Sequence, residues 1–277
     1  MNRAPRPHLI FITGTDTGVG KTVVTALLLS HLRQSGCHAL ALKPFCSGGR
    51  ADAEVLHTFQ QRDLKLNQIN PFYFPEPLAP LVAARKHRRR ITLTDALSHI
   101  RRTAASLPNP LIRQSLSPCL LIEGAGGLLT PLGEGFNLLD LISALSGTTG
   151  RASSIQYPVS SIQTILVAPN RLGTINHTIL TLRSLQAAAV QRVSILLTRA
   201  FHPRHSTPDT PSNPGILAEL LAPTRVFELP FLGRNPLCSH ALEKNRKKIK
   251  KTLASVLDSL KFQVVASGNA GKREKSL

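Results

Sequence analysis

The stretch LIFITGTDTGVGKT, residues 9–22, decides the fold. Its apolar start, LIFIT (9–13), has the composition of a buried strand, and a glycine-rich segment leads from it to Lys21 and Thr22. A strand, a glycine-rich turn and a helix in this order form a phosphate site, because backbone N–H groups and the helix N-terminus face the anion. The stretch therefore predicts a nucleotide-binding α/β protein.

The spacing of this loop departs from the common pattern G-x-x-x-x-G-K-[ST]. Five residues before Gly20 stands Thr15, and the nearest glycine is Gly14, one position earlier. The chemistry is nevertheless complete, since Lys21 can reach β/γ-phosphate oxygens and the Thr22 hydroxyl can reach Mg²⁺. We interpret the longer loop as a phosphate loop rather than as an incidental glycine-rich turn.

Apolar segments follow the loop in regular alternation with helical patterns. A helix is predicted from Thr22, with Gly36 as its stop, because leucines recur at intervals of three and four. The strands are apolar throughout rather than alternating, as in strands covered on both faces. Further strands are expected at 39–44, 119–127, 164–169, 193–198 and 225–230, with helices at 93–106 and 174–189. This order predicts a doubly wound, mostly parallel sheet flanked by helices, of the P-loop NTPase type.

Further candidate site residues follow the ends of two of these strands. Glu123 ends CLLIE, where a carboxylate can bind Mg²⁺, and it directly precedes GAGG. Asp52 follows the second strand and on its own is equally compatible with a surface acid. Lys43 and Ser47 leave the same strand, and in a chain with 34 basic residues an exposed lysine is the competing interpretation for Lys43. Parallel strands place their carboxyl ends at one edge, so these groups are expected in one crevice.

The composition restricts the classes of protein that remain. The net charge of +19 favours polyanions, but the basic residues are spread widely without interleaved aromatics, so no specific nucleic-acid partner is expected. No apolar run reaches 18 residues and the N-terminal run is too short for a signal peptide, so neither a membrane span nor a leader is expected. The cysteines match neither a zinc ribbon nor a disulfide scaffold, which indicates reduced thiols in a cytoplasmic protein; the role of Cys46 stays open.

The chain is divided into one synthetase domain over residues 1–240 and a C-terminal segment over 241–277. Within that segment EKNRKKIKK (243–251) is predicted to be a helix that is basic nearly all round, and either a solvated face or an anion-binding surface fits it. The tail after Ser267 is expected to be disordered, and residues 145–162 are expected to form a long loop.

With these elements in order, the chain resembles the dethiobiotin synthetase family. The resemblance covers about residues 9–236, over which the matching stretches occur in the same order as in the family. The matching stretches are GTDTGVGKT (14–22), LKPFCSG (42–48), NPFYFPEPLAP (70–80), EGAGGLLTPL (123–132), LGTINHTILT (172–181) and ELPFLGRNP (228–236). The first and fourth are shared in part with related synthetases and amidotransferases, whereas the K-P-x-x-S-G, E-P-x-x-P and L-G-x-I-N-H stretches are more specific. The loop with five residues between its glycines is also the family's form.

The resemblance implies an ATP-dependent ligase of biotin biosynthesis that acts on 7,8-diaminopelargonate and CO₂. One amine captures CO₂ as a carbamate, which attacks the γ-phosphate to give a carbamic-phosphoric anhydride. The second amine then attacks the carbonyl, expels phosphate and closes the ureido ring of dethiobiotin. The resemblance also implies Mg²⁺ as the cofactor and a homodimer with sites shared between subunits.

Site residues are carried over by the same resemblance. Lys21, Lys43, Thr17 and Ser47 are implied to be catalytic, and Ser47, Gly126 and Asn176 to bind the diamine. Thr22, Asp52 and Glu123 are implied to hold Mg²⁺. Nucleotide binding is implied for Gly14, Thr15, Asp16, Gly18, Val19, Gly20, Lys21, Thr22, Thr198 and Pro230. Thr198 stands where the family often has an adenine-reading asparagine, so the nucleotide preference is open.

Three other interpretations are weaker. A partition ATPase carries a second lysine five residues before the main one, but this chain has Asp16 there. An amidotransferase synthetase needs a glutaminase domain, and little chain remains after residue 236 to form one. A basic RNA-binding module leaves the motifs at the strand ends unexplained.

Overall fold

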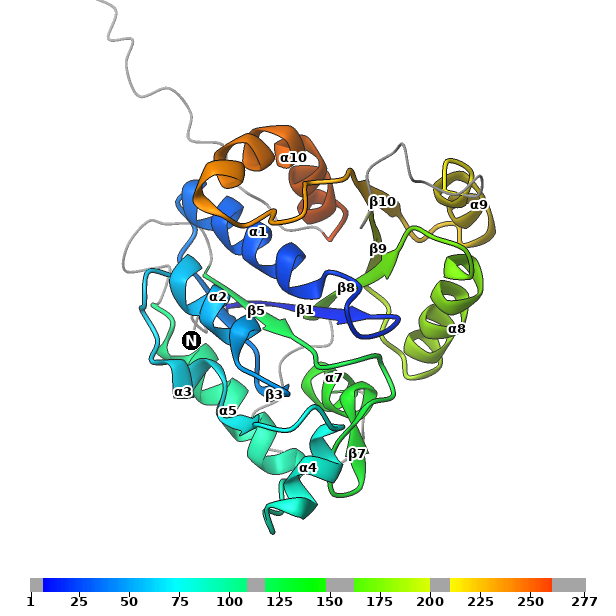
Figure 1. Cartoon of the computed structure of the whole chain (residues 1–277). Coiled ribbons are helices and arrows are strands. Elements are labelled where there is room, and N and C mark those ends of the chain that lie inside the picture. The colour runs from blue at the N-terminus through cyan, green and yellow to red at the C-terminus, as the bar shows by residue number, and fades with distance from the viewer. Residues whose placement is uncertain (1–6, 109–117, 148–161, 200–209, 261–277) are drawn as a thin grey trace, which may run out of the picture.

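The computed structural model describes residues 7–108, 118–147, 162–199 and 210–260. Six parallel strands form the central sheet in the order β10-β9-β8-β1-β5-β2 (Figure 1). The strands are β1 (His8–Gly14), β2 (Ala39–Leu42), β5 (Cys119–Glu123), β8 (Ile162–Pro169), β9 (Val193–Thr198) and β10 (Val226–Leu229). The predicted doubly wound parallel sheet is therefore confirmed, and each predicted strand is present.

Helices cover both faces of this sheet, and α1 and α10 lie together above β1 in Figure 1 while α7 lies below it. They are α1 (Lys21–Gln34), α2 (Ala51–Phe59), α3 (Leu66–Ile69), α4 (Pro80–Lys86), α5 (Leu93–Ser106), α7 (Leu138–Ser146), α8 (Thr174–Ala187), α9 (Asn213–Leu220) and α10 (Ser239–Ser259). Two small sheets pair β3 (Phe45–Ser47) with β4 (Phe72–Phe74) and β6 (Pro131–Gly133) with β7 (Phe136–Asn137). The predicted helix at 93–106 is present with those bounds.

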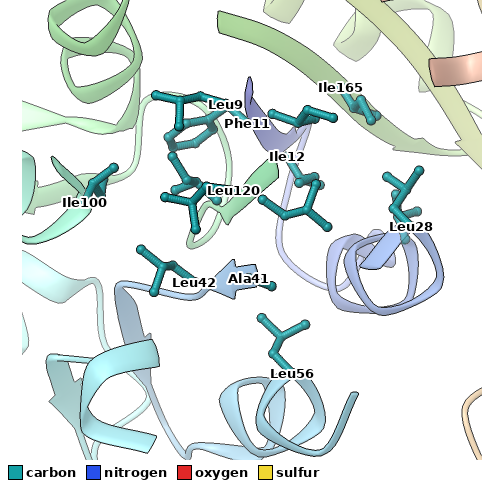
Figure 2. Close-up of a cluster of buried hydrophobic side chains, with 14 of the residues drawn as sticks. Leu9, Phe11, Ile12, Leu28, Ala41, Leu42, Leu56, Ile100, Leu120 and Ile165 are labelled. Atoms are coloured by element: carbon teal, nitrogen blue, oxygen red, sulfur yellow. The ribbon is translucent and has the colours of Figure 1, made fainter. Parts of the chain in front are cut away.

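The core forms where the apolar strands meet the helices on either side. Figure 2 shows Phe11 and Ile12 of β1 near Leu120 of β5, with Leu28 of α1 on one side and Leu56 of α2 beside Ala41 of β2. All six side chains are at most 1% exposed. Burial of such a side chain contributes roughly 1.5–3 kcal/mol, so the core holds the strand ends, and the residues that follow them, in fixed positions.

Helix α10 corrects one expectation from the sequence. EKNRKKIKK is not basic all round, because Asn245 and Ile249 face inward and are buried, and Leu253 and Val256 continue the same face one and two turns later. This face packs in the same hydrophobic cluster as β1 and α1, and the Gln163 side chain of β8 donates a hydrogen bond to the Leu260 carbonyl beyond the helix end. The helix therefore shares its core with the rest of the chain; the division at residue 240 stays a prediction.

The limits of two segments differ from the expectation. The third strand ends at Glu123, and Gly124–Gly127 form a turn because Gly126 takes a positive φ of 66°. Residues 145–147 complete α7 and its cap, and Ile162 begins β8, so both ends of the expected loop belong to regular elements. Residues 148–161 and the tail from 261 lie outside the described residues.

The four cysteines form no disulfide in the structure. All four are free, Cys37 and Cys119 lie in the core as expected, Cys46 is buried and Cys238 is exposed. Over the described ranges, no helix is long and apolar enough to span a membrane.

Candidate active site

The phosphate loop connects β1 to α1, and glycine is required at several of its positions. Gly20 caps the N-terminus of α1 with a φ of 95°, and Gly18 has a φ of 72°, both in the left-handed region that glycine adopts without strain. A Cβ on Gly14 would stand 2.7 Å from Cγ2 of Val19. The loop therefore wraps closely around its own valine, with the N-terminus of α1 open to an anion.

Lys21 is the first residue of α1, and its side chain is folded back under the loop. It is buried, and its Nζ donates a 2.7 Å hydrogen bond to the backbone carbonyl of Asp16. Burial, and then the positive charge of Lys43, lower the pKa of Lys21 to about 8. The surroundings of Lys21 therefore do not fully compensate its positive charge, and an anionic ligand would do so.

Lys43 follows the end of β2 and meets two carboxylates. Its Nζ lies 2.6 Å from Oε1 of Glu123 and 3.1 Å from Oδ2 of Asp52, and it also donates a 3.2 Å hydrogen bond to the Gly124 carbonyl. Lys43 and Glu123 are both buried, whereas the Asp52 side chain is half exposed. Lys43 is therefore no exposed loop lysine, and the competing interpretation is wrong.

The charges of this group perturb one another. Burial opposes the protonation of Lys43, but the carboxylates of Glu123 and Asp52 outweigh it and hold the pKa of Lys43 above its usual value. Burial also acts to raise the pKa of Asp52, yet the ammonium of Lys43 and hydrogen bonds from Lys43 and Thr22 lower it. Both groups are consequently charged at neutral pH.

The three residues predicted to bind Mg²⁺ are brought together. The Thr22 hydroxyl donates a 2.7 Å hydrogen bond to Oε1 of Glu123, and Thr22 also contributes to the lowered pKa of Asp52. Oε2 of Glu123 is buried and has no hydrogen-bond partner among the described residues, which is costly unless a cation or other ligand approaches it. Two carboxylates and a hydroxyl are hard oxygen ligands, so this set fits Mg²⁺.

A cavity of about 610 Å³ lies directly over this cluster. Thr17, Ser47 and Gly126 line it together with the residues just described, as the sequence predicts. The wall formed by Phe45, Thr130 and Pro77–Pro80 was not assigned from the sequence. The E-P-L-A-P stretch was the available signal for part of this wall, because a segment with several prolines has little freedom and suits a rigid rim.

Seven predicted residues do not line this cavity: Gly14, Thr15, Asp16 and Val19 of the phosphate loop, and Asn176, Thr198 and Pro230 on other elements. Asn176 lies in the first turn of α8 and is exposed. Pro230 directly follows β10. The hydroxyl of Thr198, at the end of β9, donates a 2.8 Å hydrogen bond to the Val19 carbonyl and so supports the phosphate loop from behind.

The polar groups near Thr198 are engaged with one another. Nδ2 of Asn170 donates to Oε1 of Glu228 at 2.6 Å and to the Thr210 carbonyl at 3.0 Å. Arg199 binds both carboxylate oxygens of Glu228, at 2.5 and 3.1 Å. The Asn170 backbone N–H donates a 2.8 Å hydrogen bond to the Thr198 carbonyl, but the carboxamide of Asn170 is held in this network and does not replace the asparagine that the resemblance leads us to expect at residue 198.

Comparison with known proteins agrees with this geometry. A family model described as an AAA domain matches residues 8–149. The chain is 30% identical to the ATP-dependent dethiobiotin synthetase BioD of Bacillus velezensis, covering 85% of this chain and 89% of that protein. It is 35% identical to BioD of an Anaeromyxobacter species over 76% and 84%, and 33% identical to BioD of Bacillus subtilis over 82% and 86%. The MinC:MinD complex of Aquifex aeolicus aligns with a TM-score of 0.49 and 13% identity over 96% of this chain and 98% of that chain, a distant likeness that adds nothing to these matches.

Proposed function

Because the chain belongs to the ATP-dependent dethiobiotin synthetase family, we propose that it forms dethiobiotin from 7,8-diaminopelargonate, CO₂ and ATP in biotin biosynthesis. The observation that carries this proposal is the cavity in which Lys21, Lys43, Thr22, Asp52 and Glu123 converge. Phosphoryl transfer depends mainly on positioning and on neutralising charge, and this cluster supplies both cations and hard oxygen ligands.

The proposed roles follow from where each side chain lies. The Lys21 ammonium binds the β/γ-phosphate oxygens, and Lys43 neutralises the carbamate as its oxygen attacks the γ-phosphorus and ADP leaves. Thr17 and Ser47 donate hydrogen bonds to the carbamate or phosphate. In the second step the free amine attacks the carbamoyl carbon, inorganic phosphate leaves and the ring closes. The backbone around Gly126, which lines the same cavity, contacts the diamine.

We propose that Thr22, Asp52 and Glu123 hold Mg²⁺, supported by the buried, unpartnered Oε2 of Glu123. When bound, the ion neutralises charge on the phosphate oxygens of ATP. A cytoplasmic location is also part of the proposal, supported by the four free cysteines.

We propose a homodimer in which Asn176 of one subunit binds the carboxylate of the diamine held in the other subunit's cavity. Asn176 does not line the cavity of its own subunit, yet large apolar side chains are exposed near it: Leu172 is 81%, Leu129 61% and Leu180 55% exposed. Leu129 and Leu180 border a shallow hollow of about 440 Å³ between the turn after β5 and α8. Exposed leucines of this kind mark contact surfaces, so a second copy would bring its Asn176 toward the first copy's cavity.

Mixed dimers provide a test of this shared site. Asn176→Ala should raise the KM for the diamine about 10-fold or more with little change in kcat, because one hydrogen bond to a charged carboxylate is lost. Mixing Asn176→Ala with inactive Lys21→Met subunits should restore a site with wild-type KM, since each chain supplies what the other lacks.

The matched control mixes Lys21→Met with Lys43→Met, in which every site retains one defect, and no activity should return. If the Asn176→Ala mixture keeps the raised KM throughout, the substrate carboxylate is bound within a single subunit or elsewhere.

The pKa of Lys21 predicts how ATP binding depends on pH. A pKa of about 8 means that the free protein loses this proton above about pH 8, while bound phosphates favour the ammonium and raise the pKa. ATP affinity should therefore be highest below about pH 8 and fall by up to about tenfold per pH unit above it. Calorimetry at about pH 8.5 in two buffers of different ionisation enthalpy should detect proton uptake, and Lys21→Met should show none. Affinity that is constant from about pH 7 to 9.5 would contradict this role.

The function itself is tested by phosphate release from ATP with Mg²⁺ and bicarbonate, with and without 7,8-diaminopelargonate. Diamine-dependent release with dethiobiotin identified by mass is the expected result, and release that ignores the diamine would overturn the proposal. Repeating the assay with GTP and CTP tests the base preference. We expect similar kcat/KM values for all three nucleotides, because the Thr198 hydroxyl is hydrogen-bonded to Val19 and the Asn170 carboxamide to Glu228.

A further inference from the structure

Helix α10 carries a row of basic side chains that the proposed function does not use. Lys244, Lys247, Lys248 and Lys251 recur at intervals of three and four, so they lie on one side of the helix, and all four are exposed. We call these four residues the lysine ridge. The opposite face, which contains Ile249 and Leu253, is buried in the core, so the ridge is presented by a helix whose position is fixed.

Little negative charge compensates the ridge. The ion pair that joins it to the rest of α10 lies between Lys247 and Glu243, at 3.6 Å, and Glu243 is itself largely exposed. Such pairs contribute little in water. Lys248 donates a 2.9 Å hydrogen bond to the Phe231 carbonyl, which leaves its charge unneutralised.

More basic groups extend this surface toward α1. A hollow of about 270 Å³ between α1 and α10 is lined by His31, Arg246, Lys247 and Lys250, and also by Glu243. Nε of Arg246 is buried there and has no hydrogen-bond partner among the described residues. Lys250 acts, after burial, to lower the pKa of His31. The hollow therefore continues the positive surface of the ridge and includes an unused donor.

The residue types on α10 restrict the kind of anion that the lysine ridge can bind. Sequence positions 239–259 contain no Phe, Tyr or Trp, so bases cannot stack on this helix as they do in single-strand binding proteins. The large exposed apolar side chains in the described part of the chain lie on other elements, so α10 has no apolar face to insert into a bilayer. The anion that best matches these lysines is therefore a rigid array of phosphates on the outer surface of a polymer.

We propose that the lysine ridge binds the phosphate backbone of double-stranded nucleic acid without reading its sequence. From Lys244 to Lys251 the helix rises about 10 Å, which matches about three phosphates of one strand at 3.4 Å of axial rise each. The net charge of +19 adds a long-range attraction that brings the duplex to the protein. This binding is compatible with the absence of a specific nucleic-acid partner expected from the sequence.

A salt titration of a labelled duplex of about 20 base pairs, followed by fluorescence anisotropy, tests the proposal. The test variant is Lys244→Gln/Lys247→Gln/Lys251→Gln, which keeps Lys248 and its bond to Phe231. The control is Arg62→Gln/Arg88→Gln/Arg102→Gln, which removes the same charge from exposed residues outside α10. Circular dichroism and the thermal midpoint of both variants establish that they are folded.

We expect the ridge variant to bind about 10-fold or more weakly at low salt, with the slope of log K against log salt reduced by about 2–3, and the control to stay within about 3-fold of the parent. Equal losses in both variants would show that net charge alone is responsible and would overturn the ridge. No duplex binding by the parent at low salt would also overturn it. Binding to vesicles containing phosphatidylserine in place of the duplex would do the same and assign the ridge to a membrane surface.

Discussion

Replacing Lys21 with methionine should abolish turnover and leave the folded protein at least as stable as the parent. The loss of rate should be about 10³-fold or more, because Lys21 is the proposed cation for the phosphates and such contacts act in a water-poor site. Stability should not fall, since the cost of burying the ammonium and its repulsion by Lys43 outweigh its hydrogen bond to the Asp16 carbonyl. Methionine keeps the unbranched apolar stem of the side chain and removes the ammonium together with its hydrogen bond to the Asp16 carbonyl.

The direction of the stability effect follows from the pKa of Lys21, which is about 8 in the folded protein and 10.5 in its usual state. The unfolded chain binds this proton more tightly, so at neutral pH the charged lysine costs the fold at most about 3–4 kcal/mol. That cost is fully present below about pH 8 and disappears as the pH rises toward 10.5.

Urea denaturation at about pH 7 and pH 9.5 measures this effect. The parent should gain stability relative to Lys21→Met on going to the higher pH, and the gap between them should close. Retained turnover in the folded variant would remove Lys21 from the mechanism. A variant less stable than the parent at pH 7 would mean that the buried ammonium is better compensated than its contacts indicate.

Lys43→Met should also stop turnover, by about 10³-fold or more, but with the opposite effect on stability. Lys43 is the close cation of Glu123, whose side chain is fully buried, with 2.6 Å between Nζ and Oε1. Removing one partner of a buried ion pair leaves an uncompensated charge, which typically costs about 3–5 kcal/mol. Two lysines of one cavity are thus expected to be equally necessary for catalysis and opposite in their effect on folding.

The double variant Lys43→Met/Glu123→Gln separates these effects. It removes both buried charges, so it should recover most of the stability lost in Lys43→Met while remaining inactive. Glu123→Gln alone serves as the reference for the cycle, and urea denaturation of the four proteins gives the coupling free energy. If Lys43→Met unfolds at the same urea concentration as the parent, the pair does not hold the strand ends together.

Much of the fold could be predicted because its signals are local. The strand at 193–198 and the helix at 93–106 were predicted with their actual bounds, since each is a continuous periodic segment. The inner face of α10 was missed because Asn245 and Ile249 are single interruptions in a run of lysines. Only the packing of that helix against α1 shows that they face a core.

The contents of the site could be predicted, but the contacts within it could not. Lys43 and Glu123 are 80 residues apart, and they meet because β2 and β5 are neighbours with Leu42 opposite Ile122. That adjacency depends on the strand order, which the local pattern does not specify. The hydrogen bond from Thr198 to the phosphate loop could not be predicted either, because it depends on β9 ending next to Val19.

Lys43 keeps the carboxylates of the cavity together in the protein without ligand. Asp52 and Glu123 come from different parts of the chain and carry like charges that repel each other at short range. The ammonium between them is a counter-ion that the chain carries with it, so the two carboxylates stay gathered in the resting protein. The binding surface is therefore assembled by folding itself, and an arriving substrate meets groups already in place instead of spending its binding energy on collecting them.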